Sequence, residues 1–349
     1  MKSKKLFLVS AVMVAVSLVG CGGGGGGDNS TLPPVGGAGT VPSQLQQPVP
    51  ILDSALVQTL IASTHAFGSE EYSAFNRLNA ERLQCGFGAL KQNVQIDSAA
   101  RSHNDYQIIN NMDSHFENKS QFPTGFTGIN GSDRVAAAGY KSAAAVGDLY
   151  TFKIGTSNKT GWGEAGIRGL LNAPYHMADL LDGYRDVGLS VRSSRDTTPQ
   201  GISPAIFLHV NPAYKTSEGP QLIAAKDVAT YPCDGTTGVN RQLVHEDPNP
   251  VPGRDLRKNP IGSSIYILLR EGNVLTITSA SMFESASNTA IVLRTPITKA
   301  NDPNSLFKIN QGYVTPDAPL KANTLYSVEI RGTNNGAVFT RQFTFTTGA

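Results

Sequence analysis

Residues 172–181 read Asn-Ala-Pro-Tyr-His-Met-Ala-Asp-Leu-Leu and hold His176 between a proline-led turn and an apolar run. A second short phrase, Ser-His-Phe-Glu at residues 114–117, surrounds His115 in a similar way. The chain has 349 residues and six histidines. Imidazole titrates near neutral pH and is the commonest metal ligand in proteins, so two histidines set in such phrases predict a shared polar site.

The N-terminus has the pattern of an export signal. A basic start at residues 2–5 precedes an almost unbroken apolar run over residues 6–19, which is too short to be read as a membrane span. Residues 18–21, Leu-Val-Gly-Cys, resemble the bacterial lipobox, in which cleavage leaves Cys21 as a lipidated N-terminus. The alternative is an ordinary signal peptide with an unmodified cysteine. We predict a lipoprotein signal peptide over residues 1–20 and a mature protein anchored to a membrane through Cys21.

A flexible tether is expected over residues 21–50. This segment starts with six consecutive glycines after Cys21 and is rich in Ser, Pro, Gly and Gln. It has too few large apolar side chains to offset its ordering entropy. Gly22, not aspartate, follows Cys21, which by analogy with known sorting predicts the outer membrane or cell surface if the host is Gram-negative. The protein is therefore expected in the cell envelope, facing an extracellular compartment.

The charge balance argues against one class of partner. The 29 Lys and Arg residues include three in the predicted signal, which leaves 26 basic against 27 acidic residues in the mature chain. A nearly neutral chain without basic clusters gives no electrostatic basis for binding nucleic acid.

Two cysteines remain in the mature chain besides Cys21. Cys85 and Cys233 would lie in an oxidising compartment, where disulfides form and persist. We predict a disulfide between them, although the sequence alone does not show that they are close in space. Closing so long a loop is worth on the order of 4 to 5 kcal/mol in the chain-entropy model, as an upper figure.

Prolines mark a predicted domain boundary. Residues 247–253 read Asp-Pro-Asn-Pro-Val-Pro-Gly. The pattern before this segment mixes helix and strand, and the pattern after it is typical of strands only. We therefore predict one domain over residues 51–246 and a second over residues 247–349.

The first domain is expected to be α+β, with helices packed over a small sheet. Apolar spacing predicts one helix over residues 70–83 and another that starts with Asp97 as its N-cap and places His103 on its inward face. Further helices are predicted over residues 163–171 and 177–181, and strands over residues 187–191 and 206–210. His209 falls within the second of these strands.

The second domain is expected to be all-β. Apolar and polar residues alternate over residues 326–330 and 339–345, and Asn335-Gly336 between them predicts a tight hairpin turn. Further strands are predicted over residues 265–269 and 274–278, on either side of a Gly-Asn turn. The set predicts an immunoglobulin-like sandwich that serves as a spacer or adhesive module.

An ordered set of motifs over residues 70–191 resembles the CAP superfamily, which contains cysteine-rich secretory proteins, antigen 5 and pathogenesis-related-1 proteins, in its bacterial form. The resemblance implies an α-β-α CAP sandwich. The matching motifs are Leu78-Asn79-Ala80-Glu81-Arg82, Ala99-Ala100-Arg101-Ser102-His103, Met112 before His115, Asp133-Arg134 with Gly139-Tyr140, residues 172–181 and Asp186-Val187-Gly188-Leu189.

In that family a cleft holds two histidines with acidic partners, and several members bind a divalent metal there. The resemblance assigns His115 and His176 to this cleft. It places Asp148, in Val-Gly-Asp-Leu at residues 146–149, where the family has the glutamate of a Gly-Glu-Asn segment. The second acidic position of the family has no match here, and Glu117 and Glu164 are the candidate substitutes.

Two hypotheses follow for the function. His115, His176 and Asp148 make a three-ligand set for zinc or another divalent metal, and a metal-bound water could hydrolyse peptide or cell-envelope substrates, with Glu117 or Glu164 as the catalytic group. The other hypothesis is a binding module whose histidine-lined cleft takes a partner protein, a glycan or an apolar ligand. We favour binding because the carboxylate set of the family is incomplete, and the sequence leaves enzymatic activity open.

Overall fold

The computed structural model describes residues 55–197 and 204–349. The predicted signal peptide, Cys21 and the predicted tether lie outside the described residues. The described residues belong to one compact unit. No helix among them is long and apolar enough to cross a membrane.

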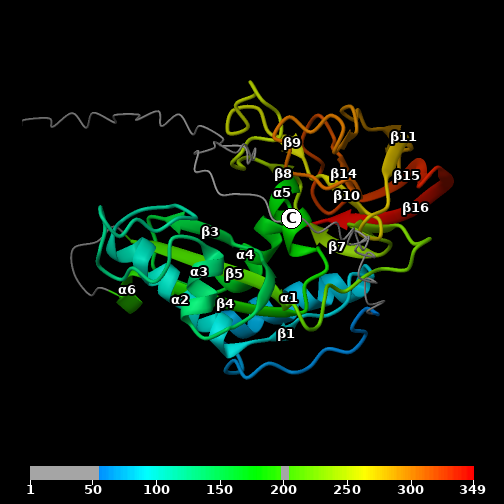
Figure 1. Cartoon of the computed structure of the whole chain (residues 1–349). Coiled ribbons are helices and arrows are strands. Elements are labelled where there is room, and N and C mark those ends of the chain that lie inside the picture. The colour runs from blue at the N-terminus through cyan, green and yellow to red at the C-terminus, as the bar shows by residue number, and fades with distance from the viewer. Residues whose placement is uncertain (1–54, 198–203) are drawn as a thin grey trace, which may run out of the picture. The chain divides into compact units, whose positions relative to one another are not determined.

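The helical part of the described chain, residues 70–215, combines helices with one mixed sheet, which confirms the predicted α+β class (Figure 1). The strands follow the order β1-β4-β5-β2, and β3 also pairs with β5. The helices are α1 (Glu70–Gln84), α2 (Val94–Ile109), α3 (Gly131–Ala137), α4 (Trp162–Leu170), α5 (Pro174–Leu180) and α6 (Ser194–Thr197). The strands are β1 (Lys91–Gln92), β2 (Ala143–Val146), β3 (Leu149–Ile154), β4 (Asp186–Ser193) and β5 (Ala205–Lys215).

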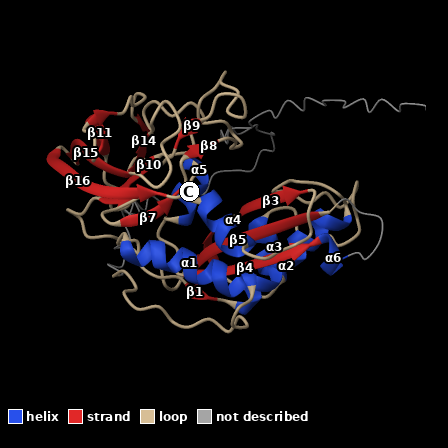
Figure 2. Ribbon diagram, turned by 180° about the vertical axis from the view of Figure 1, so that it is seen from behind, coloured by secondary structure: helices blue, strands red, loops and turns tan. Residues whose placement is uncertain are grey.

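Strand β5 is buried on both faces because helices cover both sides of this sheet (Figure 2). Ile206 and Leu208 share an apolar cluster with residues of α1 and α4. Phe207 and Ala213, which point the other way, pack with residues of α2 and α3. This alternation is the period-2 pattern of a strand and explains why β5 is apolar on both sides.

The predicted helix start at Asp97 is wrong by one turn. Helix α2 begins at Val94, and the Asn93 side chain caps it by accepting hydrogen bonds from the N–H groups of Gln95 and Ile96. Asp97 lies in the first turn, where its carboxylate accepts the N–H of Leu189 from β4 at 2.8 Å. Asparagine and aspartate are both good N-caps, so the local pattern did not distinguish the two positions.

The strand-rich part, residues 229–349, consists of strands that pair into further sheets. One sheet has the order β13-β14-β10-β6, another has the order β12-β11-β15-β16-β7, and β8 pairs with β9. The strands are β6 (Ala229–Tyr231), β7 (Thr236–Val239), β8 (Gln242–Leu243), β9 (Ile261–Gly262), β10 (Ile265–Leu268), β11 (Leu275–Glu284), β12 (Thr289–Ala290), β13 (Ile297–Thr298), β14 (Gln311–Val314), β15 (Leu325–Asn334) and β16 (Ala337–Thr347). An apolar cluster with members from β10, β14, β11, β15 and β16 joins the two larger sheets.

The hairpin predicted at Asn335-Gly336 is confirmed. These residues connect β15 to β16 with φ angles of 50° and 82°, the positive values that a two-residue turn requires. The strands on either side of the Gly-Asn turn, β10 and β11, belong to different sheets and do not pair with each other.

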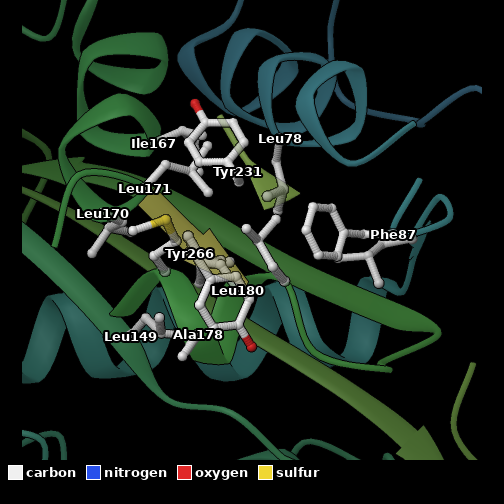
Figure 3. Close-up of a cluster of buried hydrophobic side chains, with 14 of the residues drawn as sticks. Leu78, Phe87, Leu149, Ile167, Leu170, Leu171, Ala178, Leu180, Tyr231 and Tyr266 are labelled. Atoms are coloured by element: carbon white, nitrogen blue, oxygen red, sulfur yellow. The ribbon is translucent and has the colours of Figure 1, made fainter. Parts of the chain in front are cut away.

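The two parts share an apolar core across the predicted boundary. Figure 3 shows Tyr231 and Tyr266 of the strand-rich part among Leu78 and Leu180 of the helical part. Strands β6 and β7 lie before residue 247 in the sequence and yet belong to the sheets of the strand-rich part.

The predicted disulfide between Cys85 and Cys233 is confirmed. It links the residue that ends α1 to the segment between β6 and β7, and both cysteines are buried. The bond therefore holds the helical layer against the strand-rich part.

Candidate functional site

His115 and His176 line one cavity of about 530 Å³. Asp148 lines the same cavity, so the three residues that the resemblance assigned to a cleft are gathered there. The strand-rich part completes the wall with residues 247–248 and 306–308. A space of this size suits a small organic ligand.

Asp148 reaches the cavity wall because the edge of the sheet is interrupted. β2 and β3 both pair with β5, and Gly147 and Asp148 separate them. Pro212 of β5 lies at this break, has no N–H to donate, and accepts the Gly147 N–H at 2.8 Å. A Cβ at position 147 would lie 2.7 Å from Asp179 Oδ2 and 2.8 Å from Pro212 Cγ, so glycine is required there.

The Asp148 carboxylate accepts several hydrogen bonds. His115 Nδ1 lies 3.3 Å from Oδ2, and Arg134 Nη2 lies 2.8 Å from both carboxylate oxygens. His209 Nε2 at 2.7 Å and Asn211 Nδ2 at 2.8 Å contact Oδ1. Burial alone would raise the pKa of Asp148, but His209, His115 and Arg134 outweigh burial and hold this pKa well below its ordinary value. Asp148 is therefore an ionised anchor for the groups around it.

Glu117, predicted as a substitute carboxylate, does not line the cavity, and its side chain is fully buried. It lies 2.9 Å from His103 Nδ1 and accepts the N–H groups of Thr127 at 2.6 Å and Gly128 at 3.2 Å. Burial would raise the pKa of Glu117, but these partners outweigh it and lower the pKa. His103 Nε2 lies 2.9 Å from the Ser114 carbonyl oxygen. Glu117 thus anchors the 114–117 segment.

Glu164, the other candidate catalytic carboxylate, does not line the cavity either. It lies on α4 and forms ion pairs with Arg77 at 2.7 Å and Arg168 at 3.1 Å. Its side chain is 46% exposed, so solvent screens these pairs. Both predicted catalytic glutamates are therefore engaged outside the cavity lining.

His209 is a buried neutral histidine behind Asp148. Desolvation lowers the pKa of His209 to about 3, with a smaller lowering from His103 and Arg134, although Asp148 opposes the shift. Nε2 donates to Asp148, and Nδ1 is buried without a hydrogen-bond partner in the described part of the chain. His209 lies within the apolar run Phe-Leu-His-Val at residues 207–210, and a histidine in such a run indicates a buried polar contact. The prediction of a strand here did not include that contact.

We expect His209 to make stability depend on pH. The unfolded histidine binds a proton below its ordinary pKa of 6.5, whereas the folded one stays neutral down to about pH 3. The unfolded state therefore holds more protons in this window, and the free energy of unfolding falls as the pH falls, by at most about 1.4 kcal/mol per pH unit. Urea unfolding at several pH values should show a flatter profile for His209→Gln than for the wild type. Identical slopes in the two proteins would contradict this assignment.

His176 has a carboxylate partner that the sequence analysis missed. Glu246 Oε1 lies 3.1 Å from His176 Nδ1 and also accepts the backbone N–H groups of Tyr175 and His176 at the start of α5. The Glu246 side chain is fully buried, and its Oε2 has no hydrogen-bond partner among the described residues. No local pattern marks Glu246, which contacts a residue 70 positions earlier only because of the fold.

The predicted metal ligands do not fit a metal site in this arrangement. Across residues 55–197 and 204–349, no group of three or more His, Cys, Asp or Glu side chains could hold a metal ion. The Arg134 cation already contacts both oxygens of Asp148, and Glu246, not Asp148, contacts His176. Zinc needs three or four donors with free lone pairs that converge on one point, and His115, His176 and Asp148 do not provide them.

Further acidic side chains line the cavity. Burial raises the pKa of Asp179 to about 6, and the Tyr184 hydroxyl donates to its carboxylate at 2.6 Å. Asp182 forms an ion pair with Lys308 at 2.6 Å. Asp247 is exposed at the cavity wall. The cavity therefore carries more acidic than basic groups, a property that the nearly neutral composition of the chain does not reveal.

Comparisons with known proteins give little further guidance. No family model matches the chain, and no curated protein matches it. Among solved structures, the chain is similar to an outer surface protein from Borrelia burgdorferi, with 12% sequence identity and a TM-score of 0.33. The likeness covers 45% of this chain and 100% of that chain. A likeness this distant supports no conclusion about fold or function.

Proposed function

We propose that this chain is an exported, lipid-anchored protein of the CAP type whose cavity binds a small organic ligand with an apolar body and a polar head. The proposed anchor rests on the signal and lipobox pattern of residues 2–21. The proposed CAP sandwich rests on the ordered motifs of residues 70–191 together with helices on both faces of the sheet. The strand-rich part is proposed as an immunoglobulin-like sandwich on its strand pattern.

The observation that carries the proposal is that His115 and His176 share a cavity while a separate carboxylate holds each ring. Asp148 contacts His115, and Glu246 contacts His176. The two rings lie with centroids 6.4 Å apart and are not joined through a common carboxylate. This arrangement orients two polar groups toward a ligand, and the lack of a group of three metal-ligating side chains among the described residues favours binding over metal-assisted hydrolysis.

The rest of the lining favours a small ligand among the predicted partners. Apolar side chains contribute much of the wall, including Phe116, Leu149 and Phe307. Ligand pockets typically combine such a lining with a few placed polar groups. Phe307 and its neighbours come from the strand-rich part, which under this proposal builds one wall of the binding site in addition to any role as a spacer.

We expect at least one of three indole probes, tryptophol, tryptamine or indole-3-acetate, to bind in this cavity. The probes share an apolar body and differ in their polar head. Binding should shift the NMR signals of the His115 and His176 rings. The variant Ser132→Trp, at an exposed residue of the cavity lining, should abolish binding because the indole fills the space.

The matched control is Ser217→Trp, another exposed serine that does not line the cavity, which should bind as the wild type does. No binding of any probe to the wild type, or equal binding to both tryptophan variants, would overturn the proposal. Zinc binding that disappears in the double variant His115→Ala/His176→Ala would favour metal-assisted hydrolysis instead.

A further inference from the structure

The carboxylate partners determine which nitrogen of each cavity histidine meets the ligand. A neutral ring whose Nδ1 lies beside a carboxylate carries its proton there, and its Nε2 then presents a lone pair. Nδ1 of His115 lies beside Asp148, and Nδ1 of His176 lies beside Glu246. Neither Nε2 atom has a hydrogen-bond partner among the described residues, and neither is a buried atom. In the neutral ring form, both histidines therefore offer a hydrogen-bond acceptor to the cavity.

The charged side chains around the cavity carry an excess of negative charge, which would attract a cationic hydrogen-bond donor. Among the described residues, the lining contains four aspartates, one lysine (Lys308), and no glutamate or arginine. The charged side chains that hold lining residues from behind, Arg134 and Glu246, add one charge of each sign. The count is then five negative groups against two positive groups. Walls of one sign and low polarisability focus the field on an oppositely charged ligand.

Aromatic rings supply a third feature of the cavity. Phe116, Tyr175 and Phe307 line it, and the faces of aromatic rings attract cations. Phe116 is 61% exposed, which leaves its ring accessible to a ligand.

We infer that the polar head bound in this cavity is a protonated amine, a singly charged hydrogen-bond donor joined to an apolar body. The inference rests on the proposed function and names its ligand class. An ammonium group donates to the two Nε2 atoms, complements the acidic wall and packs on the aromatic rings. A carboxylate head meets acceptors and like charge, and an alcohol head gains the hydrogen bonds without the charge attraction.

The three indole probes separate these heads. Tryptamine should bind the wild type about tenfold more tightly than tryptophol, because hydrogen bonds to a charged group are stronger than neutral ones. Indole-3-acetate should bind most weakly. Dissociation constants from NMR titration at neutral pH measure the order. Equal or tighter binding of tryptophol or indole-3-acetate would overturn the amine inference while leaving the proposed ligand-binding function standing, and failure of all three probes would overturn both.

Two charge variants are expected to change tryptamine affinity in opposite directions, which distinguishes an effect of charge from a purely structural effect. Lys308→Met removes the cavity's lysine and frees Asp182, so tryptamine should bind about threefold more tightly. Asp247→Asn removes an exposed acid, so tryptamine should bind about threefold more weakly. The ratio of tryptamine to tryptophol affinity should therefore rise in Lys308→Met and fall in Asp247→Asn, and the exposed Asp227→Asn, outside the cavity lining, should change neither probe. Changes of the same sign, or equal changes for both probes, would contradict the inference.

Discussion

Replacing Asp148 by alanine is expected to lower the free energy of unfolding by about 3–5 kcal/mol, the usual cost of removing one partner from a buried charge network. The substitution removes the carboxylate that lies 2.8 Å from the Arg134 cation, which is 1% exposed, and leaves only the more distant Glu117 carboxylate, at 4.0 Å, among the ion pairs of the described residues. It also removes the acceptor for His209 Nε2 and one of the two acceptors for the Asn211 amide, which also donates to the Gly147 carbonyl. Urea unfolding at neutral pH gives the measurement, and the loss should exceed that of any single surface substitution.

The pH dependence of this difference provides a second test. The folded Asp148 has a pKa well below the ordinary value of 3.8, so its contribution is present above about pH 4 and is lost as the pH falls further. The gap between wild type and Asp148→Ala should therefore narrow in acid. Asp227→Ala, at an exposed aspartate, is the matched control and should cost little. A loss in Asp148→Ala no larger than that of the control would refute the buried network.

Removing the disulfide is expected to cost about 4 kcal/mol. Cys85 and Cys233 are 148 residues apart, so the bond restricts a long loop of the unfolded chain. The bond also fixes the end of α1 to the segment after β6, where the helical and strand-rich parts share their core. Thermal or urea unfolding of the double variant Cys85→Ala/Cys233→Ala measures the loss.

Reduction of the wild type supplies the control for this prediction. A reducing agent should lower the stability of the wild type toward that of the double variant and should leave the variant unchanged. An unaltered unfolding midpoint in the double variant would show that the apolar core alone holds the two parts together.

Local pattern predicted the longer helices and strands but not α3, β2 or β3. Helix α1, strands β4 and β5 and the Asn335-Gly336 hairpin lie where residue periodicity and turn chemistry placed them. These features depend on neighbours within a few positions, so one sequence carries enough information. The start of α2 was misplaced because Asn93 and Asp97 are both suitable caps, and contact with β4 decides between them.

The candidate site was predicted only in part. His115, His176 and Asp148 line one cavity, in agreement with the motif assignments. Glu117 and Glu164 were expected there on their position in the sequence, but buried His103 and the arginines on α1 and α4 engage them elsewhere. The residues next to a glutamate in the sequence do not show which distant side chain it will contact, so nothing in the local pattern distinguished these two residues from Glu246.

Residue pattern predicted the α+β class, the cysteine pair and the two histidines of the cavity, and the fold then showed that Cys85 and Cys233 are close in space. The α+β class follows from the periodic spacing of apolar residues, the cysteine pair from the oxidising compartment of an exported protein, and the two histidines from short sequence motifs. The partners of the histidines, the acidic wall and the joining of both parts around one cavity depended on packing between distant segments. A charge such as Glu246 acquires its role only when the fold buries it beside a group 70 residues away, because burial and proximity set the energy of that contact.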